Sequence, residues 1–62
     1  MQANKVRPVT ADELIAYESG EQDFDATLDM FQRLVDTGLA WTLQGHYGRT
    51  AQHLIEGGYI HA

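Results

Sequence analysis

The sequence predicts an all-α fold, a compact bundle of three to four short helices preceded by an extended, basic N-terminal arm at residues 1–9. Capping residues and glycines bracket several short segments, and one segment repeats its apolar residues with helical periodicity. The only extended candidate, residues 6–9, is too isolated to be stable as a strand. At 62 residues the chain has room for one small helical domain, expected at residues 10–62.

The first helix is expected at about residues 11–19. Thr10 and Glu13 match a capping box, in which the threonine oxygen accepts a hydrogen bond from a helix amide and the glutamate reaches back to the cap. Gly20 offers the left-handed backbone that commonly ends helices.

The second helix, at about residues 24–37, has the clearest pattern in the chain. Its apolar residues recur at steps of four, three and four: Phe24, Leu28, Phe31 and Val35, with Leu34 widening the stripe. Asp23 suits the N-cap, and Gly38 suits the end. Asp29 and Arg33 lie off the apolar stripe, and their i,i+4 pairing is worth a few tenths of a kcal/mol.

The C-terminal third predicts two shorter helices. The apolar segment 39–44 is expected to form one or two helical turns closed by Gly45, and a last helix is expected at about residues 48–56. Tyr59 and Ile60 are expected to fold back onto the core as a short tail.

The net charge of −5 is unevenly distributed. Residues 11–37 carry eight carboxylates against one arginine, whereas the N-terminal arm carries Lys5 and Arg7 and no acid. This acidity argues against non-specific binding to a phosphate backbone. No stretch approaches the roughly 18 apolar residues of a membrane span, and the N-terminus lacks an apolar signal region, so a cytoplasmic protein is expected.

Composition and spacing do not predict an enzyme. The sequence has no cysteine, and His46 and His53 lie too far apart for the usual spacing of zinc ligands. Ser19 has no histidine near it in the sequence, and no glycine motif resembles a phosphate-binding loop. We therefore expect no catalytic residue, no metal and no cofactor.

The C-terminal half carries a resemblance. It lies in the run DTGLAWTLQGHYGRTA at residues 36–51, followed by Leu54, Ile55, Glu56 and Gly58. This run resembles a family of very small phage and prophage proteins that share a DTGLAW-x-LQG-x-YGR-x-A-x-x-LI-x-x-G tail, and the similarity covers about residues 10–60. The resemblance implies a viral or prophage setting in a host cytoplasm, where such proteins often bind a host or viral macromolecule. It implies no particular activity.

Two interpretations of this segment remain open. Trp41, His46, Tyr47 and Arg49 form either a tightly packed helix–turn–helix corner needed for folding or an exposed recognition patch. Aromatic residues and arginine dominate binding hot spots, which favours the second interpretation. Tyr47 and Trp41 also suit the first, because each can bury a ring while its polar atom finds a partner.

Two functional hypotheses follow. In the first, the protein is an acidic accessory module that docks on a basic surface of a host or viral protein, as an inhibitor or adaptor of the host-takeover or anti-defence type. Its candidate contacts include Asp25, Asp29 and Asp36.

In the second hypothesis, the protein is a helix–turn–helix-like regulator that binds nucleic acid as a dimer, with residues 48–56 as the recognition helix. The few cations of the chain disfavour direct nucleic-acid binding. A homodimer is compatible with both hypotheses, because Trp41, Tyr47, Tyr59 and Ile60 are many large apolar residues for one small core.

Overall fold

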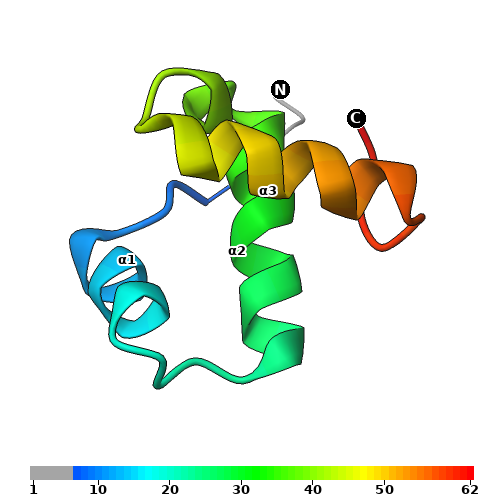
Figure 1. Ribbon diagram of the computed structural model, residues 1–62. Helices are drawn as coiled ribbons and strands as arrows, with labels where there is room; N and C mark the ends of the chain where they lie inside the picture. Colours follow the sequence, from blue (N-terminus) through cyan, green and yellow to red (C-terminus); the bar gives the residue numbers. More distant parts are fainter. Residues whose placement is uncertain (1–6) are drawn as a thin grey trace.

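The computed structural model describes residues 7–62, and Lys5 of the expected arm lies outside this range. Figure 1 shows the helical elements, which are α1 (Ala11–Glu18), α2 (Phe24–Asp36), the 3₁₀ helix η1 (Leu39–Trp41) and α3 (Gly45–Glu56). The described residues contain no strand, which confirms the all-α prediction. Among these residues, no helix has the length and apolarity that crossing a membrane requires.

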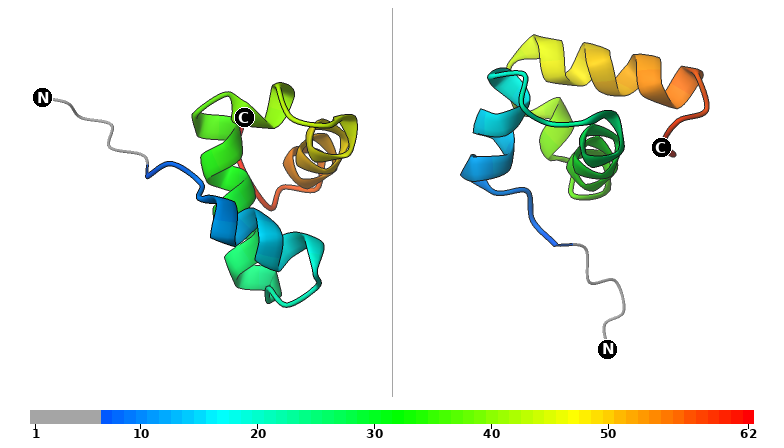
Figure 2. Two further views of the ribbon diagram at one scale, coloured as in Figure 1. Left: turned by 90° about the vertical axis from the view of Figure 1, so that its left-hand side faces the viewer. Right: turned by 90° about the horizontal axis from the view of Figure 1, so that it is seen from below.

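The three α-helices point in three different directions. In Figure 1, α2 runs upright, α3 lies across its upper half and α1 points towards the viewer. The side and bottom views in Figure 2 agree that no two of these helices run parallel. The fold is therefore a set of steeply crossing helices, in which α1 and α3 each lie beside α2 and the start of α3 comes close to α1.

The apolar core lies where α2, η1 and α3 meet. Its buried residues are Met30, Phe31, Leu34, Ala40, Tyr47, Ala51 and Ile60. Helix α1 contributes no fully buried residue. Its Leu14 and Tyr17 are partly buried against the core, and the Tyr17 ring meets Phe31 edge-on with ring centroids 5.3 Å apart.

The local signals at the starts of α1 and α2 are confirmed. The Thr10 side chain accepts a hydrogen bond from the Glu13 amide, and the Glu13 carboxylate accepts one from the Thr10 amide. The Asp23 carboxylate accepts from the Ala26 amide. The glycines that follow the two helices have left-handed backbone, at φ 79° for Gly20 and 80° for Gly38. Both helices therefore lie within one residue of their expected bounds.

The apolar stripe predicted for α2 is wrong at its first residue. Phe24 is 58% exposed, and its ring meets the equally exposed Tyr59 edge-on with centroids 5.6 Å apart. Met30, which the stripe omits, is fully buried instead. Phe24 lies in the first turn of α2, away from the end of the helix that η1 and α3 cover, so its side chain lies outside the core.

The elements of the C-terminal third differ from the prediction. The helix expected at 39–44 is only the three-residue η1, and Gly45 begins α3 rather than closing the preceding helix. α3 therefore begins three residues before the expected position 48. Tyr47 explains the difference, because it lies in the first turn of α3 and its ring is buried in the core. Core packing thus outweighs the weak helix propensity of Gly45.

The C-terminal tail folds back along α2. Ile60 is buried, as predicted, whereas the prediction is wrong for Tyr59, which stays exposed. The Gln32 side chain exchanges two hydrogen bonds with the backbone of His61, at 2.9 and 2.8 Å. This exchange attaches the tail to the middle of α2.

Candidate functional site

An open pocket of about 350 Å³ lies between α1 and the start of α3. Its lining residues are Ala11, Leu14, Ile15 and Glu18 of α1, with Leu43, Gln44 and Tyr47 from the segment that leads into α3 and its first turn. The four α1 residues are spaced three and four apart, so they lie on one face of the helix. The pocket volume is at the lower end of the range for ligand sites.

The wall of this pocket is apolar and incompletely covered. Ile15 is 63% exposed, although it lies beside the partly buried Leu14 and Leu43. No lysine or arginine belongs to the lining. A partner that covers Ile15 removes apolar area from water, which is worth about 25 cal/mol per Å².

A buried tyrosine holds a carboxylate at the edge of the pocket. Tyr47 is 3% exposed, and its hydroxyl donates a hydrogen bond to the exposed Glu18. Burial, and then the neighbouring Glu18 carboxylate, raise the pKa of Tyr47 to about 12. The phenol therefore stays protonated at neutral pH and donates to Glu18, which fixes one negative charge beside an apolar wall.

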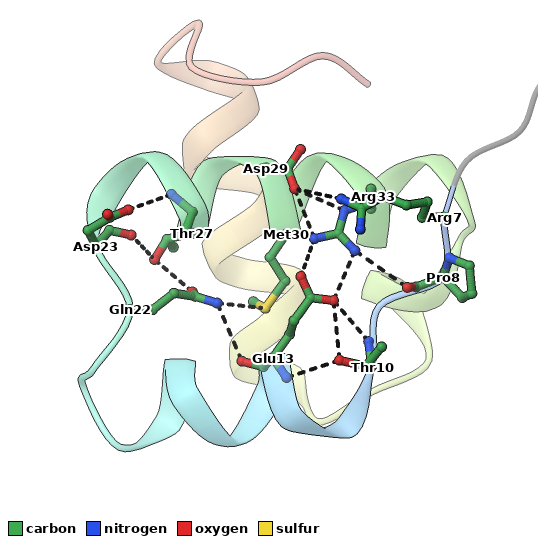
Figure 3. A network of polar contacts seen from close by, with 11 residues as sticks. Arg7, Pro8, Thr10, Glu13, Gln22, Asp23, Thr27, Asp29, Met30 and Arg33 are labelled. Atoms are coloured by element: carbon green, nitrogen blue, oxygen red, sulfur yellow. Dashed lines mark hydrogen bonds and ion pairs between the residues drawn. The ribbon is translucent and has the colours of Figure 1, made fainter.

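A second polar cluster fixes the other end of α1 (Figure 3). The guanidinium of Arg33 donates to Asp29 at 2.9 and 3.1 Å, to Glu13 at 2.9 Å and to the Pro8 carbonyl at 3.4 Å. The expected Asp29–Arg33 pair is confirmed. Although the sequence places Arg33 off the apolar stripe, its side chain is only 8% exposed. Glu13, twenty residues away in the sequence, reaches across from α1 and buries it.

The charges in this cluster shift each other's ionisation. The hydrogen bond from Arg33, followed by that from the Thr10 amide, lowers the pKa of Glu13 from its usual 4.5 to about 2. The same contact with Glu13 raises the pKa of Arg33 further above its usual value. Arg33 is therefore a permanent cation neutralised within the fold, and it positions α1 rather than facing a partner.

The three candidate aspartates, Asp25, Asp29 and Asp36, are all exposed on α2. Asp29 also lies 3.8 Å from the guanidinium of Arg7, and Asp36 accepts a hydrogen bond from Gln32 at 3.0 Å. The Asp25 side chain makes no ion pair or hydrogen bond with the described residues. Asp29 thus stabilises the fold through Arg33 and is also exposed, whereas Asp25 is exposed and makes no such contact with the described residues.

The four candidate residues of the corner do not form one exposed patch. Trp41 is 52% exposed and Arg49 is exposed, but His46 is half-buried with its ring 4.2 Å from that of Tyr47. For Tyr47 the packed-corner interpretation is right and the exposed-patch interpretation is wrong, because its ring packs among Tyr17 and Phe31. Tyr47 supports the pocket from the core side.

Sequence reasoning missed most of the pocket. The candidate residues predicted from the sequence do not include four of the lining residues, which are Ile15, Glu18, Leu43 and Gln44. These residues are close together only because of how α1 meets α3. The only local signal for the exposed Ile15 is that Leu14 and Ile15 are adjacent in a short helix. Two adjacent apolar residues point in different directions, so one of them tends to face away from the core. No group of three potential metal ligands lies together within residues 7–62.

The fold and the pocket together define a small all-α domain with an open apolar site edged by a carboxylate. Residues 5–62 match the model of a family described as a domain of unknown function (DUF7417), and the chain belongs to this family. No curated protein and no solved structure matches the chain. The resemblance to phage and prophage proteins stays a prediction.

Proposed function

We propose that this protein is a small phage-type accessory protein that binds a host or viral protein and modulates its activity. The observation that carries the proposal is the pocket between α1 and α3, in which Ile15 is 63% exposed next to an anchored carboxylate. A domain this small has few apolar side chains to spare, so an exposed isoleucine over an apolar pocket favours a binding surface.

The charge distribution supports a partner with a basic surface. Arg33 is neutralised by Glu13 and Asp29, so the exposed cations of the described residues are Arg7 and Arg49. Exposed carboxylates greatly outnumber these two cations. The carboxylates lie along α1 and α2 and in the loop between these helices. Such a surface steers encounters with a positively charged partner and disfavours nucleic acid.

The second candidate function is nucleic-acid binding in the manner of a helix–turn–helix protein. The steep crossing of α3 over α2 favours it, as do the polar residues on the outer side of α3, which are Arg49, Gln52, His53 and Glu56. Arg49 is the only arginine or lysine of α3, and Gln52 is hydrogen-bonded to Glu56 at 3.2 Å. This surface offers little to phosphates, so protein binding remains the better-supported function.

Capture from host lysate tests the proposal, with the tagged full chain as bait and with or without nuclease. We expect a protein that survives nuclease treatment and is lost with Ile15→Ser. Phe24→Ser is the matched control, because Phe24 is 58% exposed on another part of the surface. Capture of nucleic acid, or of partners that disappear with nuclease, would contradict the proposal and favour the second function.

Charge reversal separates the two functions further. Asp25→Lys with Asp36→Lys is expected to weaken protein capture and to change its salt dependence, because both carboxylates are exposed. Asp29 is left intact because it pairs with Arg33. If Arg49→Glu abolishes binding while the aspartate reversals have no effect, nucleic-acid binding gains and the acidic docking surface is refuted.

A further inference from the structure

We infer that the pocket binds a helical segment of the partner protein in which a large apolar side chain is followed, about one turn away, by a lysine or arginine. This inference rests on the proposed function and adds the chemistry of the partner. Three features of the pocket support it: an apolar wall, a carboxylate fixed at its edge and the spacing between the two.

The apolar wall calls for an apolar side chain. Leu14 and Leu43 are partly buried, and Ile15 stands exposed at the opening. A volume of about 350 Å³ exceeds what one methyl group fills and suits one or two large side chains. Because the pocket is open rather than enclosed, a segment that continues beyond it also fits, which favours a protein over a small molecule.

The carboxylate calls for a cation. Glu18 accepts the Tyr47 hydroxyl through Oε2, and its Oε1 has no hydrogen-bond partner among the described residues. No lysine or arginine lines the pocket, so no cation of the chain competes there for Glu18. A carboxylate already oriented by a buried phenol loses little freedom when it binds a cation, which raises affinity.

The spacing suggests how the two contacts are linked. Ile15 and Glu18 lie three residues apart on one helix face, with Cβ atoms about 5–6 Å apart in a regular helix. Residues three or four apart on a partner helix have the same separation. One face of a short amphipathic helix therefore places an apolar side chain over Ile15 and a cation at Glu18.

Selection from a displayed library of random peptides tests the inference. Peptides of about sixteen residues are long enough for four helical turns, and the full chain is the target. We expect the enriched sequences to carry a large apolar residue and a lysine or arginine three or four positions apart. A synthetic copy of the most enriched peptide is then measured by fluorescence polarisation against the wild type and four variants.

The variants separate the features of the pocket. Glu18→Gln keeps an oxygen for the Tyr47 hydroxyl but removes the charge, and it should weaken binding about tenfold and flatten the salt dependence. Tyr47→Phe frees the carboxylate and should weaken binding by a smaller factor, about threefold. Ile15→Ser should abolish measurable binding, whereas Phe24→Ser should bind as the wild type does.

Several outcomes would overturn the inference. They are the absence of enrichment, enrichment of acidic or uncharged peptides, and binding that Ile15→Ser and Glu18→Gln leave unchanged. A failure of this inference is distinguishable from a failure of the proposed function. A nuclease-resistant partner that Ile15→Ser still captures overturns this inference alone, whereas a lysate that yields no protein partner overturns both.

Discussion

Helix α1 and the α2–η1–α3 unit differ in how far apolar packing and polar contacts hold each in place. Every buried residue of the core belongs to α2, η1, α3 or the C-terminal tail, and α1 contributes none. Leu14 and Tyr17 of α1 pack against this core, and a polar contact fixes each end of the helix. Glu13 in the first turn contacts Arg33, and Glu18, the last residue, contacts Tyr47. Ile15 lies between these two attachments and faces the pocket.

This difference explains how so small a domain can leave part of its apolar surface exposed. Apolar packing is non-directional, and a helix held only by burial must turn its apolar face inward. Hydrogen bonds to charged groups are directional, so the contacts at Glu13 and Glu18 add to the packing of Leu14 and Tyr17 and hold α1 while Ile15 stays outward. The division between a packed unit and an attached helix is what the following predictions test.

The largest effect is expected in the packed unit. Phe31 is fully buried and contacts the rings of Tyr17 and Tyr47. Phe31→Ala should lower the free energy of unfolding by about 3–5 kcal/mol, which is most of the stability of a small domain. Urea denaturation followed by circular dichroism measures it. A loss below about 1 kcal/mol would show that the core does not lie where the structure puts it.

A smaller effect is expected at the first attachment of α1. Glu13→Gln weakens the contact with the buried Arg33 guanidinium, while Asp29 still pairs with it, so we expect a loss of about 2 kcal/mol. Amide hydrogen exchange should quicken in α1 more than in α2 or α3. Uniform acceleration across all three helices would mean that α1 is not a separately attached element.

The same attachment predicts a pH dependence. Folding lowers the pKa of Glu13 from 4.5 to about 2, so its stabilisation is complete above about pH 4.5 and is lost as the pH falls through 2. The wild type should therefore lose stability across this window more steeply than Glu13→Gln. Equal slopes for the two proteins in acid denaturation would contradict the contact with Arg33.

The second attachment predicts a late tyrosine titration. Tyr47→Phe keeps the ring and removes the hydroxyl, and we expect a loss of about 1 kcal/mol. Because the pKa of Tyr47 rises from 10 to about 12, its contribution is complete below pH 10 and is lost as the pH rises through 12. Tyrosinate absorbance should show one tyrosine ionising near pH 12 in the wild type, and this transition should be missing in Tyr47→Phe.

The smallest effect on stability is expected at the pocket itself. Ile15→Ser changes an exposed side chain and should alter the free energy of unfolding by no more than about 0.5 kcal/mol. The same substitution should remove partner capture. A loss of stability near that of Phe31→Ala would place Ile15 in the core and end the distinction between the two regions.

Sequence alone predicts the parts of this molecule that depend on neighbouring residues. The capping box of Thr10 and Glu13 and the Asp23 cap follow from spacings of three residues, and all are present. The burial of Arg33 does not, because it depends on a glutamate twenty residues earlier. The early start of α3 likewise depends on the position of the buried Tyr47 ring in the core. Helix propensity carries no information about that position.

The candidate site shows the same limit. The aspartates of α2 are exposed, as a helical wheel predicts, but the pocket combines one face of α1 with the segment that leads into α3. Its existence depends on the angle at which α1 meets α3. Trp41 and Tyr47 are both large aromatic side chains with a polar atom, yet one is exposed and the other buried. Only the tertiary arrangement decides between them.

The most direct test of the account is a nuclear magnetic resonance titration of the isotope-labelled full chain with the partner protein captured from lysate. The account predicts that the largest amide shifts fall on residues 11–18 and 43–47, around Ile15 and Glu18. Shifts concentrated on the outer side of α3, around Arg49 and His53, with α1 unchanged, would contradict it.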